Sequence, residues 1–154
     1  ADLSGDPVKP NAYCYSSVLN AFSRSKDPAA PDRALALLNR MNEMFLTGNR
    51  DAQPNSFCYN AAINCLAKSS RDDKAVQSKK LLNRMLEDYR SGRNRQAKPS
   101  ALTYSTILNA AAYTRGSPSD QDEAFRIARS CFRDALSLED ANGVEFAMFL
   151  LACA

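Results

Sequence analysis

The chain of 154 residues contains no histidine. Histidine is the commonest general base and the commonest metal ligand, so its absence removes the simplest routes to acid–base catalysis and to a zinc site. The five glycines are scattered and form no phosphate-binding loop. We therefore expect no enzyme activity and no cofactor in this chain.

Cysteine is present without the spacing that its structural chemistry requires. The five cysteines are an odd number, and no two of them form a Cys-x-x-Cys pair. Zinc sites and disulfide frameworks are therefore poorly supported. We expect free, buried or half-buried thiols, which fit a reducing compartment.

Long apolar runs and strong charge are also missing. No apolar run approaches the ~20 residues of a membrane-spanning helix, so we expect no membrane span. The net charge of +3 is mild. It does not exclude nucleic acid as a partner, but it argues against a protein that holds phosphates by charge alone.

What the sequence contains instead is one segment in three copies. The copies are PNAYCYSSVLNA at 10–21, PNSFCYNAAINC at 54–65 and PSALTYSTILNA at 99–110, about 44 residues apart. A second segment, LLNRM, occurs at 37–41 and again at 81–85. Two segments that recur in step predict a stacked array of equivalent units.

Each unit has the pattern of two helices. Apolar residues recur at i, i+3, i+4 and i+7 from the second tyrosine position of the first segment, and the preceding proline is a helix-start signal. Turn residues come next, and a second amphipathic helix is predicted at about 31–46, 73–90 and 119–137. The apolar stripe of each second helix begins with a small residue, which predicts close contact with a neighbouring helix. These residues are Ala34, Ser78 and Ala124.

The predicted fold is therefore all-α, with one domain over 1–154. Its repeats span about 11–54, 55–99 and 100–141, and 142–154 would form the opening helix of a fourth. An apolar helix of this kind cannot bury its face alone. Because the fourth unit has no second helix and the chain starts without Met, we expect an excerpt of a longer chain, or a chain that has lost a leader.

The opposite face of each opening helix carries a stripe of polar and aromatic residues at helical spacing. The stripes are Tyr13, Ser16, Asn20 and Arg24; Phe57, Asn60, Asn64 and Lys68; and Leu102, Ser105, Asn109 and Tyr113. Such an order suits single-stranded RNA, since apolar groups stack on bases, amides and hydroxyls bond base edges, and cations meet phosphate. Alternatively, the asparagines cap or brace helices and the serines are ordinary surface residues. Periodicity alone does not decide between these interpretations.

The repeated motif resembles the pentatricopeptide repeat. The resemblance rests on Pro-Asn or Pro-Ser, a Tyr followed by Ser or Asn, an Ile/Leu-Asn-Ala pattern and the later Leu-Leu-x-x-Met, and it covers nearly the whole chain from Pro10. The unit here exceeds the usual length of about 35 residues, with the extra residues in turns, where a solenoid tolerates insertion. Tetratricopeptide repeats fit less well because their Trp and Gly-Tyr signature is missing. HEAT-like helices fit the period but not the recurrent residue pairs.

The resemblance implies a right-handed α-solenoid in which each repeat binds one RNA base. The implied base-reading pairs are Ser16 with Asn55, Asn60 with Ser100, and Ser105 with Asn142. They correspond to the bases A-C-A, although Ala141 replaces the proline before the third pair. The implied base-stacking residues are Tyr13, Phe57, Leu102 and Val144, and the implied phosphate contacts are Arg24 and Lys68, whereas Tyr113 departs from the basic position.

The function expected from this resemblance is sequence-selective binding of single-stranded RNA in a mitochondrion or plastid. Stacking is worth ~1–3 kcal/mol per base, while association costs an estimated ~4–15 kcal/mol, so three repeats would bind weakly alone. Further repeats of the same chain or protein partners would then be needed. The alternative function is a protein–protein scaffold or a structural subunit of an organellar complex, with no base-specific contact to RNA.

Overall fold

The computed structural model describes residues 9–138, and this part of the chain is helical without strands. The helices are α1 (Ala12–Arg24), α2 (Ala30–Leu46), the short 3-10 helix η1 (Arg50–Ala52), α3 (Ser56–Lys68), α4 (Lys74–Arg90), α5 (Ala101–Ala112) and α6 (Pro118–Leu136). The all-α prediction is confirmed for these residues. The predicted second helices at 31–46, 73–90 and 119–137 agree with α2, α4 and α6 to within one residue at each end.

The helices begin where the sequence supplies caps. Asn11 and Asn55 each accept a hydrogen bond through Oδ1 from the backbone N–H three residues on, at 3.1 and 3.0 Å. These bonds satisfy N–H groups that a helix leaves without a partner. Ser117 caps α6 in the same way and exchanges hydrogen bonds with Asp120, so local sequence determines where these three helices begin.

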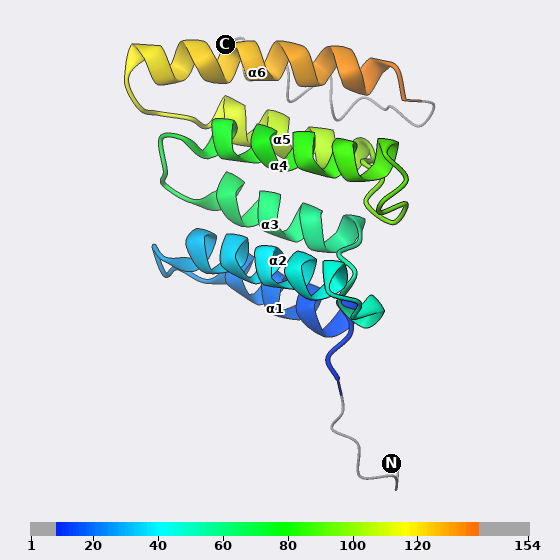
Figure 1. The fold of residues 1–154 in the computed structure, drawn as a ribbon. Helices are drawn as coiled ribbons and strands as arrows, with labels where there is room; N and C mark the ends of the chain where they lie inside the picture. Colours follow the sequence, from blue (N-terminus) through cyan, green and yellow to red (C-terminus); the bar gives the residue numbers. More distant parts are fainter. Residues whose placement is uncertain (1–8, 139–154) are drawn as a thin grey trace, which may run out of the picture.

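The opening helices α1, α3 and α5 pack side by side, α3 between the other two. Each also packs on its own second helix, and α2 and α4 pack in addition on the opening helix of the next unit. Figure 1 shows the result as a stack that runs from α1 at one end to α6 at the other. Equivalent positions of successive units therefore lie next to one another.

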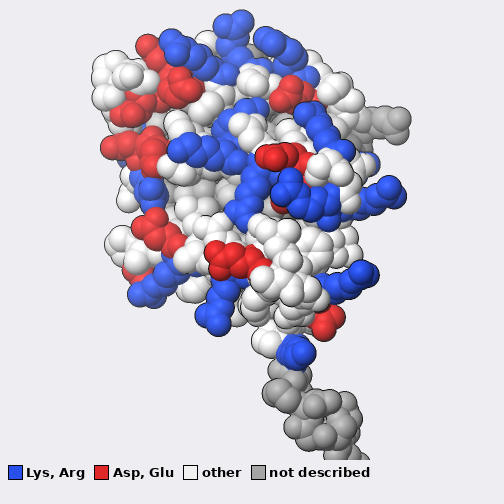
Figure 2. Space-filling view, viewed as in Figure 1, with Lys and Arg blue, Asp and Glu red and all other residues white. Residues whose placement is uncertain are grey.

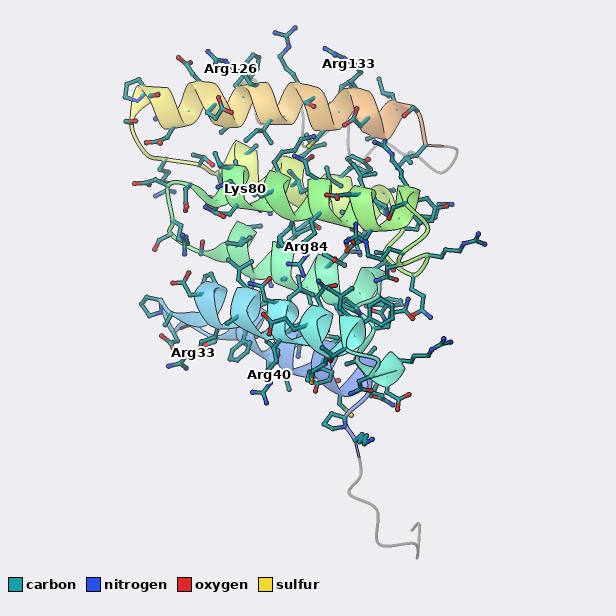
Figure 3. The ribbon with its side chains drawn as sticks, viewed as in Figure 1. Arg33, Arg40, Lys80, Arg84, Arg126 and Arg133 are labelled. Carbon is teal, nitrogen blue, oxygen red and sulfur yellow. The ribbon has the colours of Figure 1, made fainter. Side chains whose placement is uncertain are left out.

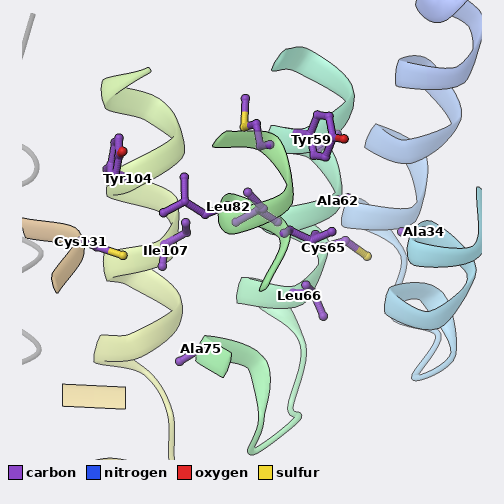
Figure 4. Close-up of a cluster of buried hydrophobic side chains, with 14 of the residues drawn as sticks. Ala34, Tyr59, Ala62, Cys65, Leu66, Ala75, Leu82, Tyr104, Ile107 and Cys131 are labelled. Atoms are coloured by element: carbon purple, nitrogen blue, oxygen red, sulfur yellow. The ribbon is translucent and has the colours of Figure 1, made fainter. Parts of the chain in front are cut away.

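The core runs continuously through the stack. Leu19, Ile63 and Leu108 occupy one position in the three units and are fully buried, and each such side chain contributes about 1.5–3 kcal/mol. Figure 4 shows side chains from successive helices, such as Leu82 and Ile107, filling the space between them. The three small residues predicted at close helix contacts, Ala34, Ser78 and Ala124, are likewise buried.

The tyrosines of the repeated segment contribute to packing in two of the three units. Tyr59 and Tyr104 are buried, and Tyr59 donates a 3.0 Å hydrogen bond to the Asp88 carboxylate. Burial, more than the neighbouring carboxylate, raises the pKa of the Tyr59 phenol above its usual value, so the hydroxyl stays protonated. Tyr15 is half-buried and its hydroxyl contacts the sulfur of Met44, which occupies the place of Asp88 in the first unit.

The links between units are ordered turns built on one motif. After α2 and α4 the chain turns at Gly48 and Gly92, whose φ angles of 106° and 73° favour glycine. The sequence Asn-Arg-x-Ala-x-Pro follows both times, at 49–54 and 94–99, and the alanine of each copy is fully buried. The links between units, which contain extra residues relative to the usual pentatricopeptide length, therefore form a second regular part of the array.

Asn94 joins the two links to each other. Its side chain is 1 % exposed, its Nδ2 donates to the Pro54 carbonyl at 2.6 Å, and its Oδ1 accepts from the Gln53 amide at 2.8 Å. The backbone N–H of Gln96 also donates to Oδ1, at 3.1 Å. A buried amide with both ends bonded fixes one arrangement of the chain, so Asn94 sets the register between successive units.

The prediction of buried or half-buried thiols is correct for Cys58, Cys65 and Cys131 and wrong for Cys14, which is exposed. Cys14 and Cys58 hold equivalent positions, but Cys58 lies against α1, with its sulfur 3.6 Å from the Ala12 carbonyl. No described helix covers the corresponding face of α1. Across residues 9–138, no helix has the length and apolar character needed to cross a bilayer.

Candidate nucleic-acid interface

Three residues predicted to stack on bases are among the most exposed large apolar side chains of the described chain. Tyr13, Phe57 and Leu102 are 78 %, 72 % and 58 % exposed. They hold equivalent positions in the first turn of α1, α3 and α5, and these helices pack side by side. One exposed apolar residue is ordinary, but a row at equivalent positions makes a periodic apolar surface. Val144, the fourth predicted member, lies outside the described residues.

The second predicted pair is connected through a third residue. The Thr103 hydroxyl donates a 2.7 Å hydrogen bond to Oδ1 of Asn60 and accepts one from the Ser100 backbone N–H at 3.0 Å. Thr103 is fully buried, whereas Asn60 and Ser100 are half-buried. The structure thus brings Asn60 and Ser100 together across the contact between α3 and α5.

The other predicted serines bond within their own helices. Ser16 and Ser105 donate to the carbonyls of Tyr13 and Leu102, at 2.9 and 3.1 Å. Such a hydroxyl keeps its lone pairs and can still accept a hydrogen bond. Ser16 is only 9 % exposed, however, so little of its surface is open to a ligand.

Asn55 caps a helix, which is the alternative role that we considered for the asparagines. Its Oδ1 accepts from the Cys58 N–H at the start of α3, which leaves the two N–H groups of Nδ2 for other partners. Its predicted partner Ser16 lies on the neighbouring helix α1. Asn142, the partner predicted for Ser105, lies outside the described residues.

The predicted phosphate contacts lie at the opposite end of the same helices from the stacking row. Arg24 and Lys68 are exposed in the last turns of α1 and α3, and neither forms an ion pair within 9–138. Tyr113, at the equivalent place after α5, is 52 % exposed. A ligand that touched both ends would therefore extend along the length of the opening helices.

The layer of second helices carries a different distribution of charge. Figure 3 labels basic side chains on all three helices; they are Arg33, Arg40, Lys80, Arg84, Arg126 and Arg133. Arg33 pairs with Asp27 at 3.0 Å and Arg126 with Glu123 at 3.3 Å, while Arg84 donates to the Asn39 side chain at 2.6 Å. Figure 2 shows acidic and basic side chains interspersed over this face. The second layer is thus a surface of mixed charge.

The sequence reading missed two residues that organise this surface, Thr103 and Asn94. Thr103 replaces the cysteine of the two earlier units, and this exchange was its only signal. Asn94 belongs to the motif Asn-Arg-x-Ala-x-Pro, and the two copies of this motif are its signal in the sequence. Both residues act through contacts between units.

The described part of the chain contains no cluster of three or more side chains suited to hold a metal ion. In comparisons with protein-family models, with curated proteins and with solved structures, nothing matched this chain.

Proposed function

We propose that this chain is a right-handed α-solenoid of pentatricopeptide-like repeats that binds single-stranded RNA, one base per repeat. The observation that carries the proposal is the hydrogen-bonded connection of Asn60 and Ser100 through Thr103. On α3 and α5, the exposed side chains of Phe57 and Leu102 come one helical turn before the next residue of each polar stripe. A base placed between Phe57 and Leu102 would be stacked by them and would meet Asn60 with its edge.

The hydrogen bond from Thr103 also bears on which base this pair selects. With Oδ1 occupied, Asn60 faces a ligand with the two N–H groups of Nδ2, which have no hydrogen bond within the described residues. Cytosine presents acceptors at O2 and N3, which match these donors. Uracil carries a hydrogen on N3 and would leave it unpaired, and an unpaired buried group costs ~1–3 kcal/mol. The geometry therefore favours cytosine in the middle of the proposed A-C-A.

Affinity is expected to be modest. Three stacked bases supply ~3–9 kcal/mol against an association cost of ~4–15 kcal/mol. Stable binding in the cell would need further repeats of the same chain or a protein partner. By the family resemblance, we place this activity in mitochondrial or plastid RNA metabolism.

A protein–protein scaffold is the second candidate, and the outer face of α1 favours it. Val18 is 45 % exposed and Cys14 is exposed, whereas the equivalent Ala62 and Cys58 of α3 are fully buried against a neighbouring helix. The face of α1 therefore carries the positions that α3 buries against a neighbouring helix, but no described helix covers it. A polypeptide partner docked there would not compete with RNA on the stacking row.

A fluorescence titration distinguishes the two functions. The chain, alone and fused to flanking repeats, is titrated into labelled RNA that contains ACA and into a scrambled RNA of equal composition. Tighter binding of the ACA strand supports base reading, and equal binding of both contradicts it. The absorbance ratio of the purified protein is a simple first measurement, because copurified nucleic acid would raise it.

A further inference from the structure

A cavity of about 260 Å³ lies between the turn that joins α3 to α4 and the turn that joins α5 to α6. Its lining is basic and hydroxylic: Lys68, Ser70, Lys74, Tyr113 and Arg115 belong to it, together with the edge of Arg71. Carboxylates are absent from this lining. The cavity is separate from the Phe57–Leu102 row at the other end of these helices.

Lys74 is the unusual member of this lining, because it is a buried cation. It is 6 % exposed, and its ammonium donates to the Ser69 carbonyl at 3.2 Å. An ammonium has three donors, and Lys74 shows no ion pair and no other hydrogen bond to the residues at 9–138. Burial, with a smaller effect of the Arg115 charge, lowers the pKa of Lys74. The folded chain thus holds two like charges close together at one cavity.

No carboxylate of the described chain forms an ion pair with Lys74 or Arg115. Arg71 is bonded to the carboxylates of Asp73 and Asp32, so this group of three carries one net negative charge. Asp72 favours the charged form of Lys74, with a smaller effect than burial or Arg115, and forms no ion pair in the described chain. Arg115 is exposed, and the Gln121 amide donates to its carbonyl at 3.1 Å, which fixes the turn that carries it.

We propose that this cavity is a binding site for a phosphate-class oxyanion, held by Lys74 and Arg115, with Lys68 at its mouth. The free donors of the Lys74 ammonium and the Arg115 guanidinium would bond the oxygens, and the anion would remove the repulsion between the two cations. The Tyr113 and Ser70 hydroxyls would add neutral donors. The site does not depend on base reading, since its ligand is a phosphoryl group and not a base.

Two sources could supply this anion: a phosphodiester of an RNA strand or free inorganic phosphate. Lys68, the residue already expected to contact the RNA backbone, belongs to the lining, so a strand that contacts Lys68 would reach the cavity. Free phosphate presents the same oxygens without a strand. Both sources are tested separately.

The experiment is an NMR titration of the isotope-labelled chain with inorganic phosphate at constant ionic strength. We expect saturable shifts of the backbone amides of Ser70, Lys74 and Arg115. Removal of a charge-assisted hydrogen bond weakens binding by about tenfold or more, so Lys74→Met and Arg115→Ala should each raise the Kd by at least that factor. Lys80→Met, an exposed α4 lysine outside this cavity, is the matched control and should leave the Kd unchanged.

The proposal is overturned if these amides do not shift saturably, or if Arg115→Ala binds phosphate as tightly as the wild type. Arg115 is exposed, so its replacement keeps the test valid even where Lys74→Met unfolds the chain. A second titration adds a short unlabelled RNA to the phosphate-bound protein. Displacement of phosphate assigns the site to the RNA backbone, and retention assigns it to free phosphate. An RNA that shifts these amides without any preference for ACA would support the oxyanion site and contradict base reading.

Discussion

The Thr103 hydroxyl donates a 2.7 Å hydrogen bond to Oδ1 of Asn60, across the contact between α5 and α3. The same hydroxyl accepts from the Ser100 backbone N–H, so one buried side chain bonds the Asn60 side chain and the main chain of Ser100. The bond to Asn60 occupies its Oδ1 and leaves the two N–H groups of Nδ2 without a hydrogen bond within the described residues. This is the most specific feature of the polar surface, and it has no counterpart in the first unit, where Cys58 contacts the Ala12 carbonyl.

Replacement of Thr103 by valine tests this relationship. Valine has nearly the volume of threonine but no hydroxyl, so Asn60 Oδ1 and the Ser100 N–H each lose this hydrogen-bond partner. We expect a loss of about 1–3 kcal/mol in the free energy of unfolding, measured by urea denaturation. The preference for cytosine over uracil in the middle position should also fall, because the Asn60 amide can then turn. Thr106→Val is the control. The Thr106 hydroxyl donates to the Leu102 carbonyl within α5, so its removal should keep that preference. Unchanged selectivity in Thr103→Val would contradict the assigned role.

Phe57→Ala tests the stacking row. Phe57 is 72 % exposed, so its removal should change the free energy of unfolding by less than about 0.5 kcal/mol. Loss of one stacking contact costs ~1–3 kcal/mol of binding, or roughly 5- to 150-fold in Kd. Fluorescence anisotropy with labelled RNA measures this change. Leu46→Ala removes a side chain of comparable exposure, 57 %, from the second layer and should bind RNA like the wild type. If the two variants change the Kd for RNA equally, RNA does not bind at the stacking row.

Asn94→Ala tests the link between units. The change removes the partner of the buried Pro54 carbonyl and of the part-buried Gln53 amide and Gln96 N–H. We expect a loss of at least about 2 kcal/mol in the free energy of unfolding. Asn49 holds the equivalent position in the first link, and its side chain makes no hydrogen bond within the described chain. Asn49→Ala should therefore cost less than half as much, and equal losses would refute the register role of Asn94.

Ser78 gives a prediction of the opposite sign. Its hydroxyl is fully buried and has no hydrogen-bond partner in the described part of the chain, whereas the first and third units have alanine at this position. A buried polar group without a partner is unfavourable, and alanine is the better helix former. Ser78→Ala should raise the free energy of unfolding by about 1 kcal/mol. Ser130→Ala, which removes a hydroxyl that accepts from Lys79, should give no such gain. A loss of stability in Ser78→Ala would contradict this account.

The helices could be predicted from the sequence because their determinants are local. The apolar period places α2 and α4 to within one residue at either end, and Pro31 and Pro118 lie at the expected helix starts. The burial of Leu19 and its equivalents follows from the same period. Comparison of the copies then indicates which positions face a neighbouring unit.

Contacts between units could not be predicted in this way. Thr103 and Asn60 are 43 residues apart, and Asn94 and Pro54 are 40 apart, so each contact depends on the register in which the units stack. The exposure of Cys14 is likewise a property of its place at the end of the described stack. The hydrogen bonds of Ser16 and Asn55 to their own helices show why polar residues at helical spacing did not by themselves identify a binding surface.

The most direct test of base reading exchanges the residues of the middle pair. The double variant Asn60→Ser with Ser100→Asn keeps the composition of the surface and gives the second repeat the Ser/Asn pair proposed to read adenine. Titrations of wild type and variant are run against RNAs that differ only in the middle base of the ACA site. We expect the wild type to prefer cytosine and the variant to prefer adenine, with an intact fold by circular dichroism. If the folded variant keeps the wild-type preference, or if neither protein distinguishes the two RNAs, the proposed reading of one base per repeat is wrong.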